Sequence, residues 1–473
     1  MVFSSYSFIL LFLPIVFSVY FICGHFKLYS VAKLWLVLAS FFFYSQGSPD
    51  FFPFFLGSVT ANYVIGCALN SLSMAGKKAE GRIVLTLGVL ANCGLLGYFK
   101  YTDFFLTNYG LITGTEVTLL HIVLPIGISF FTFQLIAFLV DSYRGETENY
   151  DVLDYLMFIT FFPQLIVGPI VHHGEVVPQF SDKRNLHINW DNVALGLFIF
   201  ALGCGKKMIL ADPLTADAQY FFNHVNPDMP MVTSWFHSIE YTVSYYFDLS
   251  GYADMAIGLG MMFNIVIPQN FNSPYRAKDF QEYWQKWHIT LSRFLGAYIF
   301  RSVYKKGCKY RNYYIATMVT FFVSGFWHGA GWTFVVWGVL NGLLVCISSF
   351  RKRRWPNLKI PIVIGVGVTF LLAVLMRILF VSTTFTDAFN VFSGLFNFNN
   401  NGMVDFMALC TEKMHIPILC AVGLAICWFL PTTKTICEKY YKINLLSLLY
   451  SSGLLAACLC NMDKVTTFLY FQF

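Results

Sequence analysis

The sequence has few charged residues for its length. Of its 473 residues, 12% are charged, whereas 57% are hydrophobic. A soluble globular domain carries about 25% charged residues, so a chain of this size cannot build a complete water-facing surface from so few charges. The shortage excludes an ordinary soluble enzyme and indicates that much of the apolar surface faces lipid.

Long polar segments, low-complexity tracts and internal repeats are also missing. No polar stretch of domain length interrupts residues 1–473, so we expect one membrane domain over the whole chain. The absence of a repeat between the halves argues against a transporter built from inverted repeats. A transporter or channel for a small solute still stays the alternative, because intramembrane histidines and carboxylates would suit it.

Several catalytic and metal-binding motifs are absent. The sequence contains no G-x-S-x-G, no Walker-type G-K-[ST] and no H-E-x-x-H motif. Its 12 cysteines form no C-x-x-C pair, so we expect neither a metal site nor a disulfide framework. The net charge of +6 is clustered in loops, as in membrane proteins with basic cytoplasmic loops, and does not indicate a nucleic-acid partner.

Apolar runs predict an all-α polytopic membrane protein. A spanning helix needs about 20 mostly apolar residues, and we expect roughly 11 to 13 helices when short or re-entrant ones are included. The segment Met1–Phe21 lacks the basic start and cleavage site of a signal peptide, so we expect a permanent helix there. The candidate helices are 7–24, 31–45, 51–72, 83–99, 116–140, 154–171, 193–211, 232–262, 330–350, 360–382, 416–430 and 444–460.

Basic residues predict which loops are cytoplasmic. The stretch Lys278–Arg311 interleaves basic and aromatic residues, and 351–354 reads RKRR, so both should lie on the cytoplasmic side. The leg between them, Asn312–Phe326, would rise only about 22 Å as a helix, whereas the hydrocarbon core is about 30 Å thick. The turn WHGAGW, Trp327–Trp332, is therefore expected inside the membrane.

His328 is the first candidate for chemistry. It is an ionisable residue at the membrane depth just inferred, where such residues are costly. A neutral imidazole accepts a proton from a hydroxyl and returns one to a leaving thiol, and Trp327 and Trp332 would exclude water. The alternative is a histidine that bonds a backbone carbonyl and has no chemical role.

His288 is the second candidate. Helical spacing in YWQKWHITLSRF places Trp284, His288 and Ser292 on one helix face. The histidine would orient the substrate or the first histidine, or it would belong to an interfacial aromatic belt with no chemical role.

Other polar residues and histidines leave two interpretations open. Buried polar groups must be paired, so they either line a substrate tunnel or tie helices together. His224 and Asp228 are expected to be ordinary loop residues. The adjacent His172 and His173 would point apart on a helix and make a poor chelate. The tunnel candidates are Trp287, Ser292, Trp327, Asn341, Gln134, Gln164, Asp248 and Asp254.

Nearly the whole chain resembles the membrane-bound O-acyltransferase family. The motifs YWQKWHITLSRFL and FFVSGFWHGAGWTFVVWGVLNG carry the paired histidines of that family. Segments such as LPIGISFFTFQLIAFLVDSYRG and YYFDLSGYADMAIGLGMMF are similar to its bacterial branch, which includes the membrane subunit of alginate O-acetyltransferase. The resemblance implies a ring of helices around a tunnel, with His328 as the catalytic histidine and His288 as the second motif histidine.

The resemblance also implies a reaction. It is the transfer of an acyl group, expected to be acetyl, from cytoplasmic acetyl-CoA toward an exported polysaccharide or cell-wall glycan. No bound cofactor is expected, the expected location is the bacterial inner membrane, and a periplasmic acetyltransferase is the expected partner protein. Alginate, peptidoglycan, cellulose and capsular or lipopolysaccharide glycans all suit the sequence as acceptors.

One segment departs from the pattern of the family. After Leu295 the chain reads GAYIFRSVYKKGCKYRN, without the Pro-Leu-Gly-Gly loop that is usual in the bacterial branch. The departure bears on any partner or carrier that docks on that cytoplasmic face, and it leaves the two histidines untouched.

The two basic clusters make the sidedness testable. Cysteines placed at Lys306 and Arg353 of a cysteine-free variant should both resist an impermeant thiol reagent added to intact cells, because both clusters are expected in the cytoplasm. Both should react after the cells are permeabilised. Labelling of either site from outside would contradict the expected topology.

Overall fold

A computed structural model describes residues 1–147, 150–305, 307 and 310–462 of the protein. All the regular secondary structure in these ranges is helical, and the ranges contain no strand. This confirms the all-α prediction. Lys306, Lys309 and the terminal FLYFQF lie outside the described residues. Among the described helices, six are long and apolar enough to cross a membrane, or seven if the bent pair α20–α21 is one span.

The described residues form two compact units, and each is presented by itself. Unit 1 comprises residues 1–200 and 255–268, and unit 2 comprises residues 201–254 and those from 269 onward. The helices α10 (Trp190–Cys204) and α12 (Met231–Met262) carry the chain from one unit into the other. That the whole chain acts as one domain stays a prediction.

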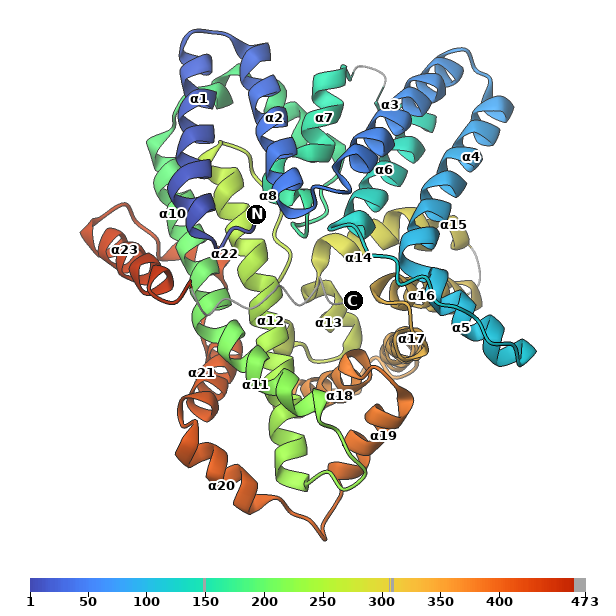
Figure 1. Ribbon diagram of the computed structural model, residues 1–473, viewed down its shortest axis with the longest axis vertical. Helices are drawn as coiled ribbons and strands as arrows, with labels where there is room; N and C mark the ends of the chain where they lie inside the picture. The colour runs from blue at the N-terminus through green and yellow to red at the C-terminus, as the bar shows by residue number, and fades with distance from the viewer. Residues whose placement is uncertain (148–149, 306, 308–309, 463–473) are drawn as a thin grey trace. The chain divides into compact units, whose positions relative to one another are not determined.

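Unit 1 packs helices around buried aromatic rings. Helices α1 and α2 lie side by side, and α3, α4 and α6 pack together (Figure 1). The ring of Phe43 lies 5.7 Å from that of Phe8 and 5.9 Å from that of Phe162. The elements confined to this unit are η1 (Phe8–Phe12), α1 (Leu13–His25), α2 (Tyr29–Gly47), α3 (Phe52–Met74), α4 (Lys78–Leu96), η2 (Gly97–Tyr101), α5 (Thr102–Thr113), α6 (Ile128–Tyr143), α7 (Val152–Thr160), α8 (Phe162–Leu165), α9 (His173–Ser181) and η3 (Lys183–Leu186).

Two predicted helices of unit 1 are shorter than the hydrophobic runs suggest. The run 116–140 becomes helical only at Ile128, after Gly127 with φ of +75°. The run 154–171 is split, because α7 ends at Thr160 and a new helix with Pro163 in its first turn begins. Hydropathy predicts burial in both runs, but it does not report these changes of backbone direction.

Unit 2 contains both motif histidines. Helix α16 ends at His328 and α17 begins at Trp332, so the break predicted within WHGAGW is present. The elements of this unit are η4 (Gly205–Ala211), α11 (Asp212–Asn223), η5 (Pro274–Arg276), α13 (Phe280–Lys286), α14 (Ile289–Leu295), η6 (Gly296–Phe300), α15 (Arg301–Val303), α16 (Tyr310–His328), α17 (Trp332–Arg354), α18 (Ile362–Val381), α19 (Phe385–Gly394), α20 (Met403–Glu412), α21 (His415–Phe429), α22 (Thr433–Lys439) and α23 (Leu445–Leu459).

Glycines allow α16 and α17 to touch along their backbones. A Cβ atom added to Gly338 would lie 2.5 Å from the carbonyl oxygen of Phe321, and one added to Gly325 would lie 2.5 Å from that of Phe334. Side-chain carbons do not come that close to a backbone, so the helices approach only because both positions are glycine. Since the two helices flank the His328 turn, this contact also fixes that turn.

Gly338 should therefore tolerate no side chain. We expect Gly338→Ala to lower the free energy of unfolding by about 1–3 kcal/mol, the cost of overpacking. The measurement is thermal unfolding of the purified protein in detergent micelles.

The matched control is Gly367→Ala in α18, where an added Cβ would meet nothing within 4 Å. Alanine favours a helix over glycine by roughly 0.8–1.0 kcal/mol, so this variant should be neutral or more stable. Equal melting temperatures for the two variants would contradict the close backbone contact.

Candidate functional site

The imidazole of His328 lies in an aromatic chamber. The residue is 4% exposed, and its ring centre lies 5.0 Å from that of Trp327, 5.1 Å from Trp337 and 5.4 Å from Phe380. Trp332, at the exposed start of α17, is itself 52% exposed. Trp337 and Phe380, which sequence analysis missed, also face the His328 ring.

His288 lies between two helices and not within one. Helix α13 ends at Lys286, His288 has a φ of +45°, and α14 begins at the next residue. The predicted helix face through Trp284, His288 and Ser292 is therefore wrong, although the Ser292 hydroxyl still donates to the Trp284 carbonyl at 3.2 Å. His288 is buried, and its ring centre lies 5.9 Å from that of Phe271.

Asn270 holds the break at His288 in place. Its backbone carbonyl accepts a hydrogen bond from the N–H of Ile289 at 2.8 Å. Its side-chain oxygen accepts from the N–H of Thr290 at 3.2 Å and from the Thr290 hydroxyl at 2.9 Å. A helix start leaves such N–H groups without partners, so a residue outside the helix supplies the cap and fixes the left-handed backbone.

Trp287 and Arg377 connect the segments of the two histidines. The guanidinium carbon of Arg377 lies 3.9 Å from the ring centre of Tyr245, 5.1 Å from that of Trp287 and 5.0 Å from that of Phe380. Phe380 also faces His328, so α18 contributes to both neighbourhoods. Sequence analysis missed Arg377, although an arginine inside the apolar run 360–382 is the signal that marks a functional candidate.

A cavity of about 380 Å³ lies in unit 2 beside this cluster. Its wall includes Trp284, whose ring packs 5.8 Å from that of Trp337, which in turn packs on His328. The volume falls within the range of small-molecule sites, about 300–1,000 Å³. Ser292, one of the tunnel candidates, lines this cavity. Further lining residues are Gln281, Leu291, Tyr313, Phe321 and Ser324.

The basic end of α17 meets the start of α13 near this cavity. Lys352 Nζ lies 2.9 Å from the Asp279 carboxylate and 3.1 Å from the side-chain oxygen of Gln281, which lines the cavity. Burial alone would raise the pKa of Asp279. The hydrogen bonds from Lys352 and the Glu282 amide, together with the charges of Lys352 and Arg351, outweigh burial and leave that pKa below its ordinary value.

Two predicted tunnel carboxylates form ion pairs inside unit 2. Asp248 and Asp212 both lie 2.6 Å from Nζ of Lys207. Asp254 lies 2.6 Å from Nζ of Lys206, and a hydroxyl of α22 also bonds to it. Burying a charge is costly unless a group of opposite charge is paired with it. Because both carboxylates are paired with lysines, the geometry favours the interpretation that they tie helices together.

The predicted amide residues divide between the units. Asn341 is buried in unit 2, and its side chain donates to the Trp337 carbonyl at 2.7 Å. Gln134 and Gln164 are buried in unit 1, where Gln164 donates to the Phe158 carbonyl at 2.6 Å. Of these three, only Asn341 therefore belongs to the unit of the histidines.

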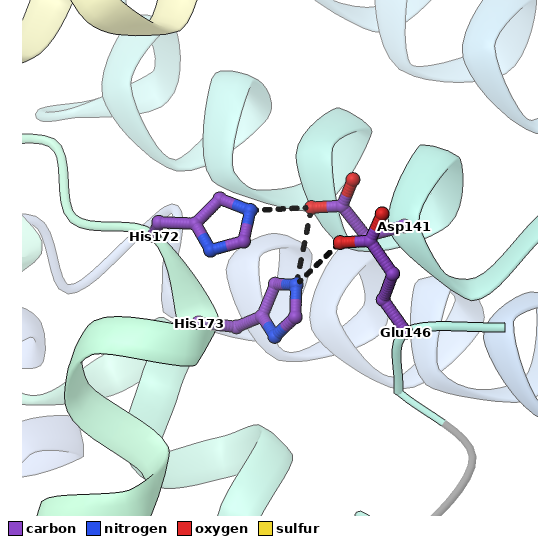
Figure 2. A group of neighbouring side chains, drawn as sticks. All are labelled: Asp141, Glu146, His172 and His173. Atoms are coloured by element: carbon purple, nitrogen blue, oxygen red, sulfur yellow. Dashed lines mark ion pairs between the residues drawn. The ribbon is translucent and has the colours of Figure 1, made fainter. Parts of the chain in front are cut away.

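The structure corrects the prediction for the adjacent histidines of unit 1. His172 precedes α9 with an extended backbone, φ −90° and ψ 141°, and His173 is the first helical residue. The two side chains therefore converge, and each Nε2 lies 3.3 Å from the same oxygen of Asp141 (Figure 2). They would point apart only if both lay within the helix.

The loop pair behaves as expected. His224 Nδ1 lies 2.7 Å from the carbonyl of Tyr220, and the Asp228 carboxylate accepts from Asn397 at 2.8 Å. The two residues thus bond to different neighbours, His224 to Tyr220 and Asp228 to Asn397.

Comparisons with known proteins match most of the chain. A family model described as MBOAT, membrane-bound O-acyltransferase family, matches residues 84–383. The chain is 39% identical over 444 residues to the peptidoglycan O-acetyltransferase of Helicobacter pylori, covering 88% of this chain and 83% of that protein. It is 34% identical over 408 residues to a Pseudomonas aeruginosa protein named "Probable alginate O-acetylase AlgI", covering 84% of this chain and 75% of that protein. Both histidine breaks lie within the matched residues.

A more distant relative is the teichoic acid D-alanyltransferase of Bacillus subtilis. It is 27% identical over 265 residues, covering 52% of this chain and 65% of that protein.

The backbone at His288 gives a stability prediction. A left-handed conformation costs an L-residue other than glycine about 1–2 kcal/mol, so His288→Ala retains this strain while His288→Gly removes it. We expect the glycine variant to be more stable than the alanine variant by about 1 kcal/mol in thermal unfolding. The reverse order would contradict the positive φ.

Proposed function

The chain belongs to the membrane-bound O-acyltransferase family, and from this premise we propose that it moves an acetyl group from acetyl-CoA toward a cell-envelope glycan. It is a multi-pass membrane acyltransferase, and the family does not favour the transporter alternative. The observation that carries the proposal is the buried imidazole of His328 at a helix break, enclosed by Trp327, Trp337 and Phe380. Among the relatives compared, those named for O-acetyl transfer match more of the chain than the one named for D-alanyl transfer, which favours acetyl.

His328 acts as the general base in the proposed reaction. The acceptor hydroxyl gives its proton to the imidazole as its oxygen bonds to the carbonyl carbon of the thioester. The carbon–sulfur bond of the tetrahedral intermediate then breaks, and the departing sulfur takes the proton from the imidazolium. His328 ends neutral, and the surrounding rings keep competing water from the carbonyl.

The cavity beside Trp284 is the proposed path of the acyl donor. Its wall includes Trp284, whose ring packs on that of Trp337, and Trp337 packs on His328; the apolar wall suits a thin, largely uncharged thioester arm. Lys352 and Arg351 lie at the same end of α17, with Lys352 bonded to the lining residue Gln281. Cations in that position suit the phosphate groups of coenzyme A, and they belong to the cluster expected in the cytoplasm.

The acceptor side of the proposal rests on the relatives. The protein lies in the inner membrane and passes the acetyl group to a hydroxyl. That hydroxyl belongs to the glycan itself or to a periplasmic acetyltransferase that relays the group. Peptidoglycan is the favoured polymer, because the relative named for it is 39% identical over most of both chains. We propose that His288, which lies between α13 and α14, orients the acyl donor and does not transfer protons.

Replacement of His328 should abolish acetyl transfer. Glutamine keeps a hydrogen-bonding side chain of similar size but cannot take a proton near neutral pH. We expect both His328→Gln and His328→Ala to lower the rate by at least about 10²-fold, the contribution of a general base. The measurements are acetyl-CoA consumption in proteoliposomes and acetylation of the polymer in cells.

Two further variants complete the test. His288→Gly should keep more activity than His328→Gln, and His187→Gln, at an exposed position of unit 1, should keep all of it. A well-inserted His328→Gln protein with close to parental activity would mean that this histidine only ties helices.

A further inference from the structure

Four side chains of unit 1 converge at the junction of α6 and α9. Asp141, Glu146, His172 and His173 each offer one ligand atom, and these atoms all lie within 4.8 Å of one another (Figure 2). Asp141 and His173 are buried, whereas the Glu146 side chain is 46% exposed. Neither of the two motif histidines belongs to this group, and the proposed acyl transfer uses none of it.

The spacing is that of ligands around an ion. Nε2 of His173 lies 3.3 Å from Oδ2 of Asp141 and 3.8 Å from Oε2 of Glu146. Ligand atoms that bind a tetrahedral zinc ion at about 2.0–2.1 Å lie about 3.3 Å from one another. This spacing matches the first distance, and the second, 3.8 Å, is longer than it by about 0.5 Å.

The ring of His173 is oriented as a metal ligand. Its Nδ1 lies 2.8 Å from the hydroxyl of Tyr150, so the other nitrogen is directed at the two carboxylates. That Nε2 atom is buried and has no hydrogen-bond partner among the described residues. A ligating histidine is commonly held by a hydrogen bond from its second nitrogen, and this ring shows that arrangement.

His172 orients the Asp141 carboxylate and caps α9. Its Nδ1 accepts a hydrogen bond from the N–H of Gly174 at 3.2 Å, where it caps α9. The proton of the neutral ring is therefore on Nε2, which faces Oδ2 of Asp141 at 3.3 Å. Arg144 holds the other oxygen, Oδ1, at 3.1 Å. Together these contacts fix the orientation of the Asp141 carboxylate.

The loop that carries Glu146 is built in advance. Gly145 has a φ of +78°, and the N–H of Glu146 donates to the Asp141 carbonyl at 2.9 Å. Thr147 is buried and bonds to the Ser142 hydroxyl at 2.7 Å and to Asn70 of α3 at 3.1 Å. The side chain of Glu146 is thus presented to Asp141 and His173 from a fixed backbone.

We propose that His173, Asp141 and Glu146 bind one divalent first-row transition-metal ion, zinc or manganese, that joins the end of α6 to the start of α9. One imidazole and two carboxylates suit such ions, and water would complete the coordination. The other histidine–carboxylate group, Asp217, His237 and Glu240, is less suitable, because the ammonium of Lys413 already lies 2.5 Å from Asp217.

The test measures bound metal and not catalysis. The full chain, without a histidine tag, is purified in detergent, stripped with a chelator, loaded with Zn²⁺ or Mn²⁺ and separated from free ions. Elemental analysis should find about one ion per chain for at least one of the two metals. Loading should also raise the melting temperature, because the ion binds the folded state.

Variants identify the ligands. Glu146→Gln changes a half-exposed side chain, so it should fold normally and bind the ion at least about tenfold more weakly. His173→Gln should lose binding, while His187→Gln, an exposed histidine of the same unit, should retain it. The proposal would be overturned if the parent protein bound much less than one ion per chain for both metals, or if Glu146→Gln retained as much metal as the parent. Either result would leave the activity tests of His328 unaffected.

Discussion

A helix that breaks among apolar side chains must find partners for its own backbone groups, because no water is present to bond them. Both motif histidines of this chain lie at such breaks. At His288, the carbonyl and side chain of Asn270 supply the missing acceptors. At His328, glycine contacts let α16 and α17 pack closely on either side of the turn. The two motif histidines are therefore held where the backbone is irregular, and their positions depend on these local contacts.

The turn at His328 could be predicted because it follows from length. The leg from residue 312 is too short to cross the bilayer, and the small residues 329–331 allow a break. The break at His288 could not be predicted in the same way. Its segment has a helical pattern, and the residue that interrupts it, Asn270, precedes it in the sequence and acts through hydrogen bonds that periodicity does not report. The same limit applies to His172 and His173, whose convergence depends on where α9 begins.

Three charged residues of unit 2 are paired with opposite charges or lie against aromatic rings. Asp248 and Asp254 each bond a lysine of the π-helical segment η4, which ties α12 to its neighbours. Arg377 lies instead against the rings of Tyr245, Trp287 and Phe380, an arrangement in which cation–π attraction replaces a carboxylate. The sequence predicts that buried polar groups need partners, but the identity of each partner is a property of the folded chain.

The chamber around His328 is assembled from three successive helices, and this has a consequence for biosynthesis. Trp327 and Trp337 come from α16 and α17, which can pair as soon as both have left the ribosome, because their contacts are local in sequence. Phe380 comes from α18 and arrives only after the basic segment 351–354 has been synthesised. The surroundings of the histidine are therefore complete only once α18 has been made, and a chain that stops before α18 would lack the ring of Phe380 beside His328.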